Sequence, residues 1–323
     1  MAKYKIPEEG IYDARPLGKG RMFLLGFQHM FAMFGATVLV PILTGLDVST
    51  TLLFAGLGTL LFHLITGGKV PAFLGSSFAF LGGYAAVAPM LGEFQDQPNL
   101  EMLPYACFGV LCAGLMYVIL AALFKAFGAS KVMRFFPPIV TGPIIIAIGL
   151  NLSSSAINNC SKNWWVAIVA IAIIVACNIW GKGMVKIIPI LLGVIGSYVV
   201  AVICDASVRE TLVQNVSNAK WFALPIYKEE TVFGLLTSGN VDAHLLLTSV
   251  ITIVPLSLAT MVEHIGDVSA ISSTCNRNYI ENPGLHRTLL GDGLATSLAG
   301  FLGGPANTTY GENTGVLELS HVY

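Results

Sequence analysis

Apolar runs long enough to cross a lipid bilayer recur along this chain. A helix needs about 20 predominantly apolar residues to span a hydrocarbon layer of roughly 30 Å, and the runs 104–124 and 164–180 carry no charged residue. The pattern predicts an all-α polytopic membrane protein with ten spans, of which the third, fifth and last are short for a full crossing. The expected spans are 22–43, 50–66, 78–91, 104–124, 138–151, 164–180, 187–204, 247–270, 288–303 and 311–323.

Charged residues are few, and their distribution indicates the orientation of the spans. Only 11% of the residues are charged, against about 25% in soluble domains. Lysine and arginine accumulate in cytoplasmic loops; with the N-terminus inside, thirteen of the 17 fall in cytoplasmic segments and four in outer ones. We therefore expect a multi-pass protein of the cell membrane, surrounded by lipid, whose polar residues 1–21 lie in the cytoplasm and form no cleavable signal peptide.

Two proline-containing segments interrupt apolar sequence. They are 71–78, Pro-Ala-Phe-Leu-Gly-Ser-Ser-Phe, and 305–312, Pro-Ala-Asn-Thr-Thr-Tyr-Gly-Glu, and both suggest extended backbone. Non-helical backbone at membrane depth is tolerated only where protein buries it or where it lines a polar cavity. A pair of interrupted spans at corresponding positions of two halves is the best indication in a sequence of a transporter's binding site.

The same two segments suggest an internal repeat. Pro71 and Pro305 are 234 positions apart, and this offset carries His29 in the first span onto Glu263 in the eighth. Because the eighth span follows the first by seven crossings, the second copy is expected to be upside-down in the membrane. Inverted repeats with broken helices are typical of secondary transporters. By this logic a second half would also have spans eleven to fourteen, so about ten of fourteen expected spans are present.

Carboxylates inside spans are the first candidate functional groups. A charged side chain at the bilayer centre costs roughly 2.5–3.5 kcal/mol on insertion scales and usually serves function, and Glu263 lies within the eighth span. Asp267 is four residues further on and shares its helical face, whereas His264 is rotated by about 100°. Two interpretations stay open for both carboxylates: they face the interior of the bundle and serve function, or they lie at a solvated cytoplasmic end of the span.

Glu312 stands where the second extended segment passes into a helix. Free backbone N–H groups at a helix N-terminus carry partial positive charge and can hold ligand oxygens. The first segment has the same geometry at Phe78, so two half-helix N-termini are expected near the midplane, beside Glu263 and Glu312. This chemistry suits a small planar ligand with N–H donors and carbonyl acceptors. Phe78 and Tyr310 would stack on it or simply pack, and Ala36 would allow ligand entry or close helix contact.

His29 is the titratable side chain of the first span. Either it is a hydrogen-bonded core histidine, or it belongs to a polar link to Glu263. Because a carboxyl group in a span can take up and release a proton, we hypothesise proton coupling through Glu263, His29 and Asp267. The sequence has no P-loop, no HExxH motif and no CxxC pair. We therefore expect no enzyme activity, no cofactor, no metal and no nucleic-acid partner.

At these residues the chain resembles the nucleobase–ascorbate transporter (nucleobase–cation symporter-2) family, and the uracil permease branch in particular. The resemblance extends from about residue 16 to the end of the chain. The segments that carry it are 28–37 (Gln-His-Met-Phe-Ala-Met-Phe-Gly-Ala-Thr), 70–80 (Val-Pro-Ala-Phe-Leu-Gly-Ser-Ser-Phe-Ala-Phe), 262–266 (Val-Glu-His-Ile-Gly), 282–287 (Asn-Pro-Gly-Leu-His-Arg) and 307–313 (Asn-Thr-Thr-Tyr-Gly-Glu-Asn).

The resemblance implies a fourteen-span inverted-repeat fold in which spans three and ten each contain a short strand, and the two strands pair at the substrate site. A core domain would comprise 22–127 (spans one to four) and 244–323 (spans eight to ten). A gate domain would include 128–204 (spans five to seven), and 205–243 would be an extracellular linker.

The resemblance also implies roles for individual residues. The glutamates at 263 and 312 would bind the N–H and carbonyl edge of a pyrimidine. Gly311 and Phe78 would contribute backbone amides, and Tyr310 and Ala36 would line the pocket. His29 would belong to the proton-linked polar network.

In the family that the chain resembles, the residues at two positions differ between uracil carriers and purine carriers. Uracil permeases can carry histidine four residues after the glutamate of span eight, whereas this chain has Asp267, as some purine-transporting relatives do. Glu312 matches the uracil branch, since purine carriers often have glutamine there. We therefore predict import of uracil with a proton by alternating access, in a protein that can form a homodimer. The alternatives are a purine (xanthine or uric acid type) symporter and a membrane protein that binds a nucleobase without transporting it.

Overall fold

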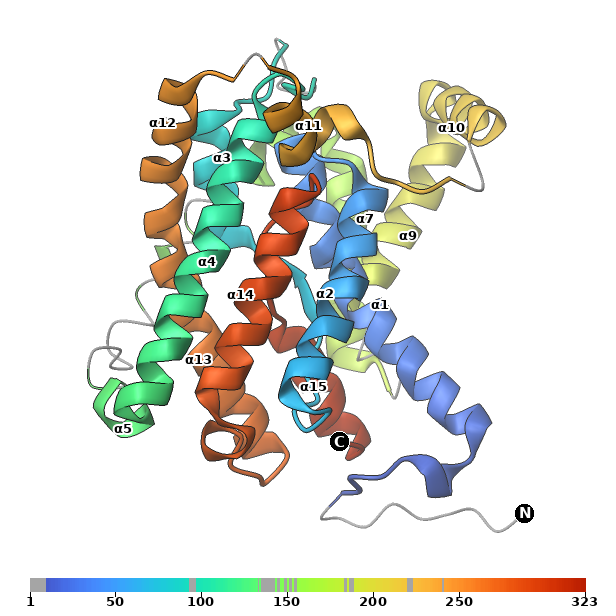
Figure 1. Cartoon of the computed structure of the whole chain (residues 1–323). Coiled ribbons are helices and arrows are strands. Elements are labelled where there is room, and N and C mark those ends of the chain that lie inside the picture. The colour runs from blue at the N-terminus through green and yellow to red at the C-terminus, as the bar shows by residue number, and fades with distance from the viewer. Residues whose placement is uncertain are drawn as a thin grey trace.

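The computed structural model describes residues 10–92, 97–132, 156–182, 189–219, 223–239 and 241–323, together with residues 134, 143, 146, 147, 150, 153 and 185. Most of this part of the chain is helical (Figure 1). Most of the expected fifth span, 138–151, lies outside the described residues. The helices are α1 (Lys19–Thr44), α2 (Val48–Thr66), α3 (Leu81–Val87), α4 (Leu103–Phe127), α5 (Ala129–Val132), α7 (Trp164–Trp180), α9 (Pro189–Cys204), α10 (Ala206–Asn218), α11 (Val232–Thr237), α12 (Ala243–Ile253), α13 (Ser257–Thr274), α14 (Leu285–Phe301) and α15 (Gly311–Ser320).

Within the described residues, four helical stretches are long and apolar enough to cross a membrane. They are α1, α2, α4 and the stretch Ala243–Thr274, which joins α12 to α13. Two bent pairs pass the same test together: Ala156–Lys162 with α7, bent by 119°, and Leu191–Cys204 with α10, bent by 109°. The expected third and last spans correspond to shorter helices, α3 and α15.

The expected eighth span, 247–270, is longer in the structure and has a break. A 3₁₀ turn, Val254–Leu256, separates α12 from α13. Pro255 lies in this turn, and proline has no backbone N–H to donate and clashes with the preceding turn of an α-helix. The break therefore lies where the sequence removes a backbone hydrogen bond.

The segment 205–243, expected to be a linker, has helical structure of its own. It contains α10 and α11 and a 3₁₀ turn at Lys228–Glu230. Val232 is fully buried in a cluster with Phe80, Tyr84 and Ala306, and the Thr50 hydroxyl donates to the Pro225 carbonyl oxygen at 2.6 Å. The part between Pro225 and α11 is therefore packed onto the helical core.

The order of elements repeats at the offset of 234 residues. Shifting α1, α2 and the strand β1 (Leu74–Ser76) by 234 gives 253–278, 282–300 and 308–310. These ranges overlap α13, α14 and the strand β2 (Asn307–Thr309). Likewise 78–87, which holds a 3₁₀ turn and α3, becomes 312–321, the region of α15. The same succession of two helices, a strand and a short helix thus occurs twice.

The two strands cross the interior side by side and run antiparallel. Leu74 pairs with Thr309, Gly75 with Thr308 and Ser76 with Asn307. The ladder continues beyond both strands, since Tyr310 N donates to Phe73 O at 3.0 Å and Ser77 N to Ala306 O at 2.8 Å. In Figure 1 the pair lies between α14 and α2. All six strand residues are buried, so the ladder satisfies backbone groups that water does not reach.

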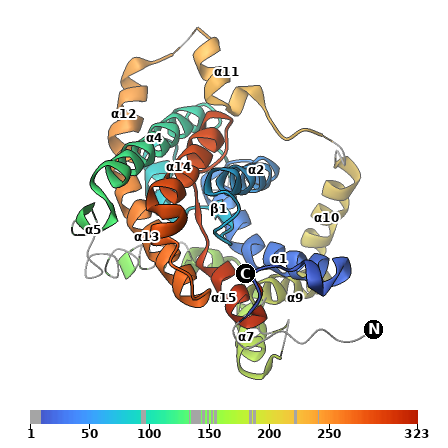
Figure 2. The ribbon, with the colours of Figure 1, turned by 60° about the horizontal axis from the view of Figure 1, so that its bottom comes forward.

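Helices α1 and α2 pack against β1, helices α13 and α14 pack against β2, and α4 packs on α14. Helices α14 and α4 approach closely because Gly114 faces Gly293: a side chain at Gly114 would lie 2.6 Å from the Gly293 carbonyl oxygen. Small residues at helix contacts allow such approach in membranes. In Figure 2, α7, α9 and α10 lie to one side, beyond α1, and α7 and α9 pack on each other.

Candidate functional site

The helix α15 begins at Gly311, directly after the strand β2. Its first-turn N–H groups have no intrahelical partner and carry partial positive charge. Glu312 lies in this first turn and is exposed. Asp267 of α13 lies beside the start of α15: Asp267 Oδ1 is 3.8 Å from the position that a Cβ atom on Gly311 would occupy. A helix start with free donors is thus flanked by two carboxylates.

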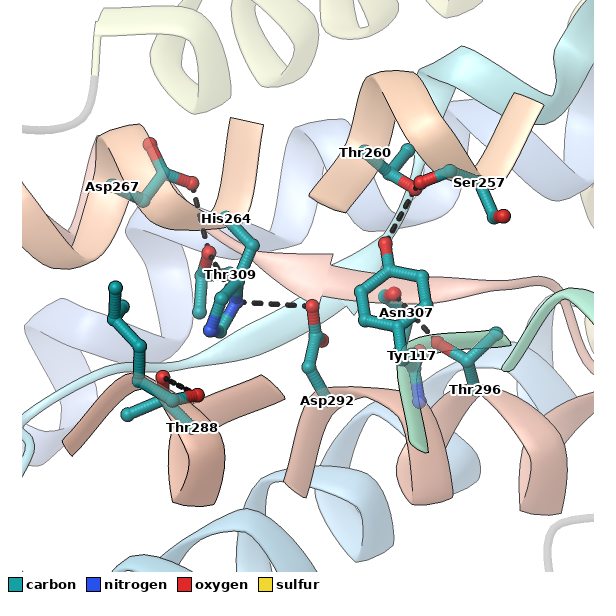
Figure 3. Close-up of polar contacts among 11 residues, drawn as sticks. Tyr117, Ser257, Thr260, His264, Asp267, Thr288, Asp292, Thr296, Asn307 and Thr309 are labelled. Carbon is teal, nitrogen blue, oxygen red and sulfur yellow. Dashed lines mark hydrogen bonds and ion pairs between the residues drawn. The ribbon is translucent and has the colours of Figure 1, made fainter. Parts of the chain in front are cut away.

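Asp267 is tied to the strand β2 by a hydrogen bond. The Thr309 hydroxyl donates to Asp267 Oδ2 at 2.9 Å, as Figure 3 shows. The same hydroxyl lies 3.4 Å from His264 Nδ1. The Asp267 side chain is half-buried, so this carboxylate points into the protein and is not a freely solvated end of the helix.

Glu263 lies one helical turn before Asp267 and is half-buried. The carboxylates whose charges act on it are Asp267, Asp292 and Glu312. Four acidic side chains from α13, α14 and α15 are therefore electrostatically linked. Carboxylates accept hydrogen bonds, so this group can bind a ligand that carries N–H donors.

Tyr310 is buried, with 5% of its surface exposed. Its hydroxyl donates to the Ser76 carbonyl oxygen at 2.8 Å and accepts from the Thr37 hydroxyl at 3.3 Å. Its ring covers Gly75, where a Cβ would lie 2.5 Å from ring atoms. In the structure Tyr310 therefore joins β1, the end of β2 and α1, and its ring supports the strand crossing.

The first broken segment supplies the opposite side of the crossing. Phe78 opens a 3₁₀ turn before α3 and is half-buried, as is Ala36 of α1. The Ser76 hydroxyl donates to the Thr37 carbonyl oxygen at 2.9 Å. Ser77 Oγ is buried without a hydrogen-bond partner among the described residues. Most buried polar atoms in proteins are paired, so Ser77 keeps hydrogen-bonding capacity for a ligand or water.

His29 lies against α15. Asn313 Nδ2 donates to the His29 carbonyl oxygen at 3.1 Å and lies 3.2 Å from His29 Nδ1. Asn313 follows Glu312 directly and is 2% exposed. The described contacts thus connect His29 to the helix that carries Glu312.

Four residues near the predicted site were not among the predicted site residues: His264, Asp292, Thr309 and Asn313. His264 Nδ1 lies 3.0 Å from Asp292 Oδ2, and both side chains are fully buried. Asp292 is an aspartate within an expected span, and such a residue is by itself a functional-site hypothesis. No comparable signal marks Thr309 or Asn313, since neutral polar side chains are common in helices and strands.

Among the described residues, no cluster of three or more His, Cys, Asp or Glu is arranged to hold a metal ion. The groups brought together are carboxylates, hydroxyls and backbone N–H donors at a helix start. Such a set can bind a neutral polar ligand through both its N–H and its carbonyl groups.

The overall fold is similar to that of a solved transporter. The transmembrane domain of a cyanobacterium bicarbonate transporter, BicA, superposes with a TM-score of 0.60, covering 97% of this chain and 81% of that one, at 15% identity. At this identity the similarity shows the fold alone.

Relatives identified by sequence are more similar to this chain than the solved structure is. The uracil permease of Bacillus caldolyticus is 39% identical over 313 residues, covering 94% of this chain and 68% of that protein. The uracil permease of Bacillus subtilis is 39% identical over 311 residues, covering 92% of this chain and 66% of that protein. The putative pyrimidine permease RutG of Escherichia coli is 36% identical over 309 residues, covering 93% and 65%. The chain spans about two thirds of the length of these relatives. Residues 20–323 match the model of the Permease family, and the chain therefore belongs to this family of membrane transport proteins, in the uracil permease branch of the nucleobase–cation symporters.

Proposed function

We propose that this protein imports uracil together with a proton by alternating access. The observation that carries the proposal is the start of α15, where Glu312 and free backbone N–H groups adjoin Asp267 and, one turn away on α13, Glu263. Uracil presents N–H donors and carbonyl acceptors on one planar edge. Carboxylates accept from the N–H groups and backbone amides donate to the carbonyls. Relatives named uracil permease support this choice of ligand.

In this proposal, Glu263 and Glu312 bind the N–H and carbonyl edge, with backbone N–H groups of Gly311 and Phe78. Tyr310 supports the strand crossing from within, and Ala36 borders the opening on α1. The proton is taken up and released within the group formed by Glu263, Asp267 and His29. The neighbouring carboxyl groups of α13, α14 and α15 support this step, because a carboxyl group within a span can take up and release a proton.

We further propose how the chain is divided. The repeated succession of elements at an offset of 234, together with the antiparallel strands, supports an inverted repeat. Segments 22–127 and 244–323 would form a core that moves against a gate containing 128–204, with 205–243 on the outside. The protein would lie in the cell membrane with its N-terminus in the cytoplasm, alone or as a homodimer.

A purine symporter is the second candidate, and Asp267 is the observation that favours it. Uptake of radiolabelled uracil by cells expressing the full-length protein, with unlabelled uracil, xanthine and thymine as competitors, separates the two. We expect competition by uracil and weak competition by xanthine. Competition by xanthine alone would contradict the pyrimidine assignment.

Binding and coupling need their own measurements. A protein that binds uracil in detergent but accumulates none in liposomes would be a binding protein and not a transporter. For coupling, uptake is compared with and without a protonophore and with sodium replaced by choline. We expect the protonophore to abolish uptake and the replacement of sodium by choline to leave uptake unchanged. Glu263→Gln should abolish proton-driven uptake, whereas Glu318→Gln, on the exposed side of α15, should leave it unchanged.

A further inference from the structure

A buried chain of polar groups connects α14 to the candidate site. It runs from Asp292 on α14 to His264 on α13, then to Thr309 on β2 and on to Asp267 on α13 (Figure 3). Asp292 and His264 are fully buried, and Thr309 is 2% exposed. The sequence reasoning set His264 aside because it points about 100° away from Glu263.

The hydrogen-bond directions in this chain follow from the inventory of donors. The Thr309 hydroxyl gives its hydrogen to Asp267 Oδ2 at 2.9 Å, which leaves its oxygen as an acceptor toward His264. His264 Nδ1 lies 3.0 Å from Asp292 Oδ2 and 3.4 Å from Thr309 Oγ1. A hydrogen on Nδ1 suits both contacts, because the Thr309 oxygen accepts and an ionised Asp292 oxygen also accepts.

The surroundings fix the imidazole in this orientation. The ring of Phe62 meets the His264 ring edge-on, with centroids 6.4 Å apart. Among the described residues, His264 Nε2 and both Asp292 oxygens have no hydrogen-bond partner, so the 3.0 Å approach of His264 Nδ1 to Asp292 Oδ2 is the polar contact that compensates this carboxylate. A buried carboxylate whose neighbouring donor is removed is left uncompensated. His264 is therefore the group that holds Asp292 on one side and orients Thr309 on the other.

We propose that His264 is a positioning residue for the substrate site: it holds Asp292 and, through Thr309, fixes the Asp267 carboxylate beside the start of α15. The inference deepens the proposed function and rests on it for the identity of the ligand. It assigns His264 no contact with the nucleobase. Its effect on binding passes through the Thr309 hydroxyl and through Asp267.

The test compares two substitutions of His264 with one control. Asparagine places an amide N–H near the position of Nδ1, whereas leucine fills similar space without a donor. His244, exposed in the first turn of α12, serves as the control in His244→Leu. Uracil binding to the purified full-length protein is measured on fractions that elute as folded protein. We expect His264→Leu to weaken binding about tenfold or more, His264→Asn to restore most of it, and His244→Leu to bind like the parent.

Two results would overturn the proposal. One is folded His264→Leu protein that binds uracil like the parent. The other is His264→Asn binding as weakly as His264→Leu, because a role in packing alone needs no donor at Nδ1. Thr309→Val provides a further check. If His264 acts through Thr309, then the double variant His264→Leu/Thr309→Val should bind uracil no more weakly than the weaker-binding single variant. Additive losses of affinity in the double variant would contradict an action through Thr309.

A measurement without ligand separates this proposal from the assignment of uracil. Melting temperatures of the parent, His264→Leu, Thr309→Val and the double variant His264→Leu/Thr309→Val form a cycle that needs no nucleobase. Coupling between the two sites is expected even if the parent binds no uracil, in which case only the proposed function fails. Independent effects on the melting temperature would contradict the polar chain itself.

Discussion

The hydroxyl of Tyr310 donates a hydrogen bond to the backbone carbonyl oxygen of Ser76 at 2.8 Å, and the two residues are 234 positions apart. This separation equals the offset that relates the two copies of the repeated succession of elements. The same offset relates two pairs of the strand ladder. Position 75 plus 234 is 309, and position 308 minus 234 is 74, so the pair Gly75–Thr308 corresponds to the pair Leu74–Thr309. Equivalent positions of the two copies thus meet at the strand crossing, and Tyr310 fastens them to each other.

Removing this hydroxyl is expected to loosen the crossing. Tyr310→Phe keeps the ring over Gly75 but leaves the buried Ser76 carbonyl without this donor. Loss of such a hydrogen bond costs about 1–2 kcal/mol, so the melting temperature of the detergent-solubilised protein should fall. Tyr198→Phe, at a half-exposed position on α9, should leave it unchanged; equal losses in both variants would contradict the role assigned to Tyr310.

Gly75 is expected to tolerate no side chain. A Cβ there would lie 2.5 Å from the Tyr310 ring and 2.7 Å from Thr37 Oγ1, so Gly75→Ala forces the ring or the strand to move, at a cost of about 1–3 kcal/mol. The matched control is Gly56→Ala on α2, where nothing lies within 4 Å of the added carbon. Alanine in a helix interior should stabilise that variant by roughly 0.5–1 kcal/mol. The melting temperature is therefore expected to fall in Gly75→Ala and to rise in Gly56→Ala.

The strand crossing and its neighbourhood show what the sequence can and cannot predict. Pro71 and Pro305 mark both breaks, because proline has no backbone N–H to donate and disfavours continuation of a helix. Asp267 shares a face with Glu263 by helix geometry alone, so their proximity was predictable. The partners of Asp267 were not, since Thr309 is 42 residues away and reaches it only after α14 folds back.

His264 shows a second limit of sequence reasoning. Its angle of about 100° from Glu263 correctly excludes it from the same face of α13. The angle says nothing about what that other face meets, which is Asp292 of α14. An aspartate in an apolar run is costly enough to signal a function, but its pairing depends on how α13 and α14 pack, and the glycine contact between α14 and α4 contributes to that packing.

Asn313 should anchor α15 to α1. Its amide donates to the His29 carbonyl oxygen at 3.1 Å in a buried position, so Asn313→Ala should lower stability by about 1 kcal/mol and weaken uracil uptake by displacing Glu312. Thr237→Ala is the control, because the Thr237 hydroxyl donates to the Phe233 carbonyl oxygen at 2.8 Å on the exposed end of α11, in a segment expected outside the membrane. An exposed bond competes with water, so its loss should have little effect on either measurement.

Lower pH is expected to favour packing of the segment between Pro225 and α11 through Glu230. Burial, together with the negative charges of Asp47 and Glu229, raises the pKa of Glu230. A carboxyl group that binds its proton more tightly in the folded state adds stability as the pH falls through its raised pKa, and that contribution is lost as the pH rises. Glu230→Gln should therefore raise the melting temperature at neutral pH and flatten its rise on acidification. Glu210→Gln, on exposed α10, should keep the pH profile of the parent.

Glu312 is expected to decide which nucleobase is accepted. As a carboxylate it only accepts hydrogen bonds, whereas glutamine both donates and accepts. Glu312→Gln should therefore lose affinity for a ligand edge with N–H donors and gain tolerance for one with an additional acceptor, at about 1–3 kcal/mol for each mismatched buried group. Competition of labelled uracil uptake by uracil and xanthine measures this ratio directly. We expect xanthine to become the relatively stronger competitor in Glu312→Gln and to stay weak in Glu318→Gln. An unchanged ratio would mean that Glu312 does not contact the base, and that Glu263 and Asp267 alone define the ligand edge.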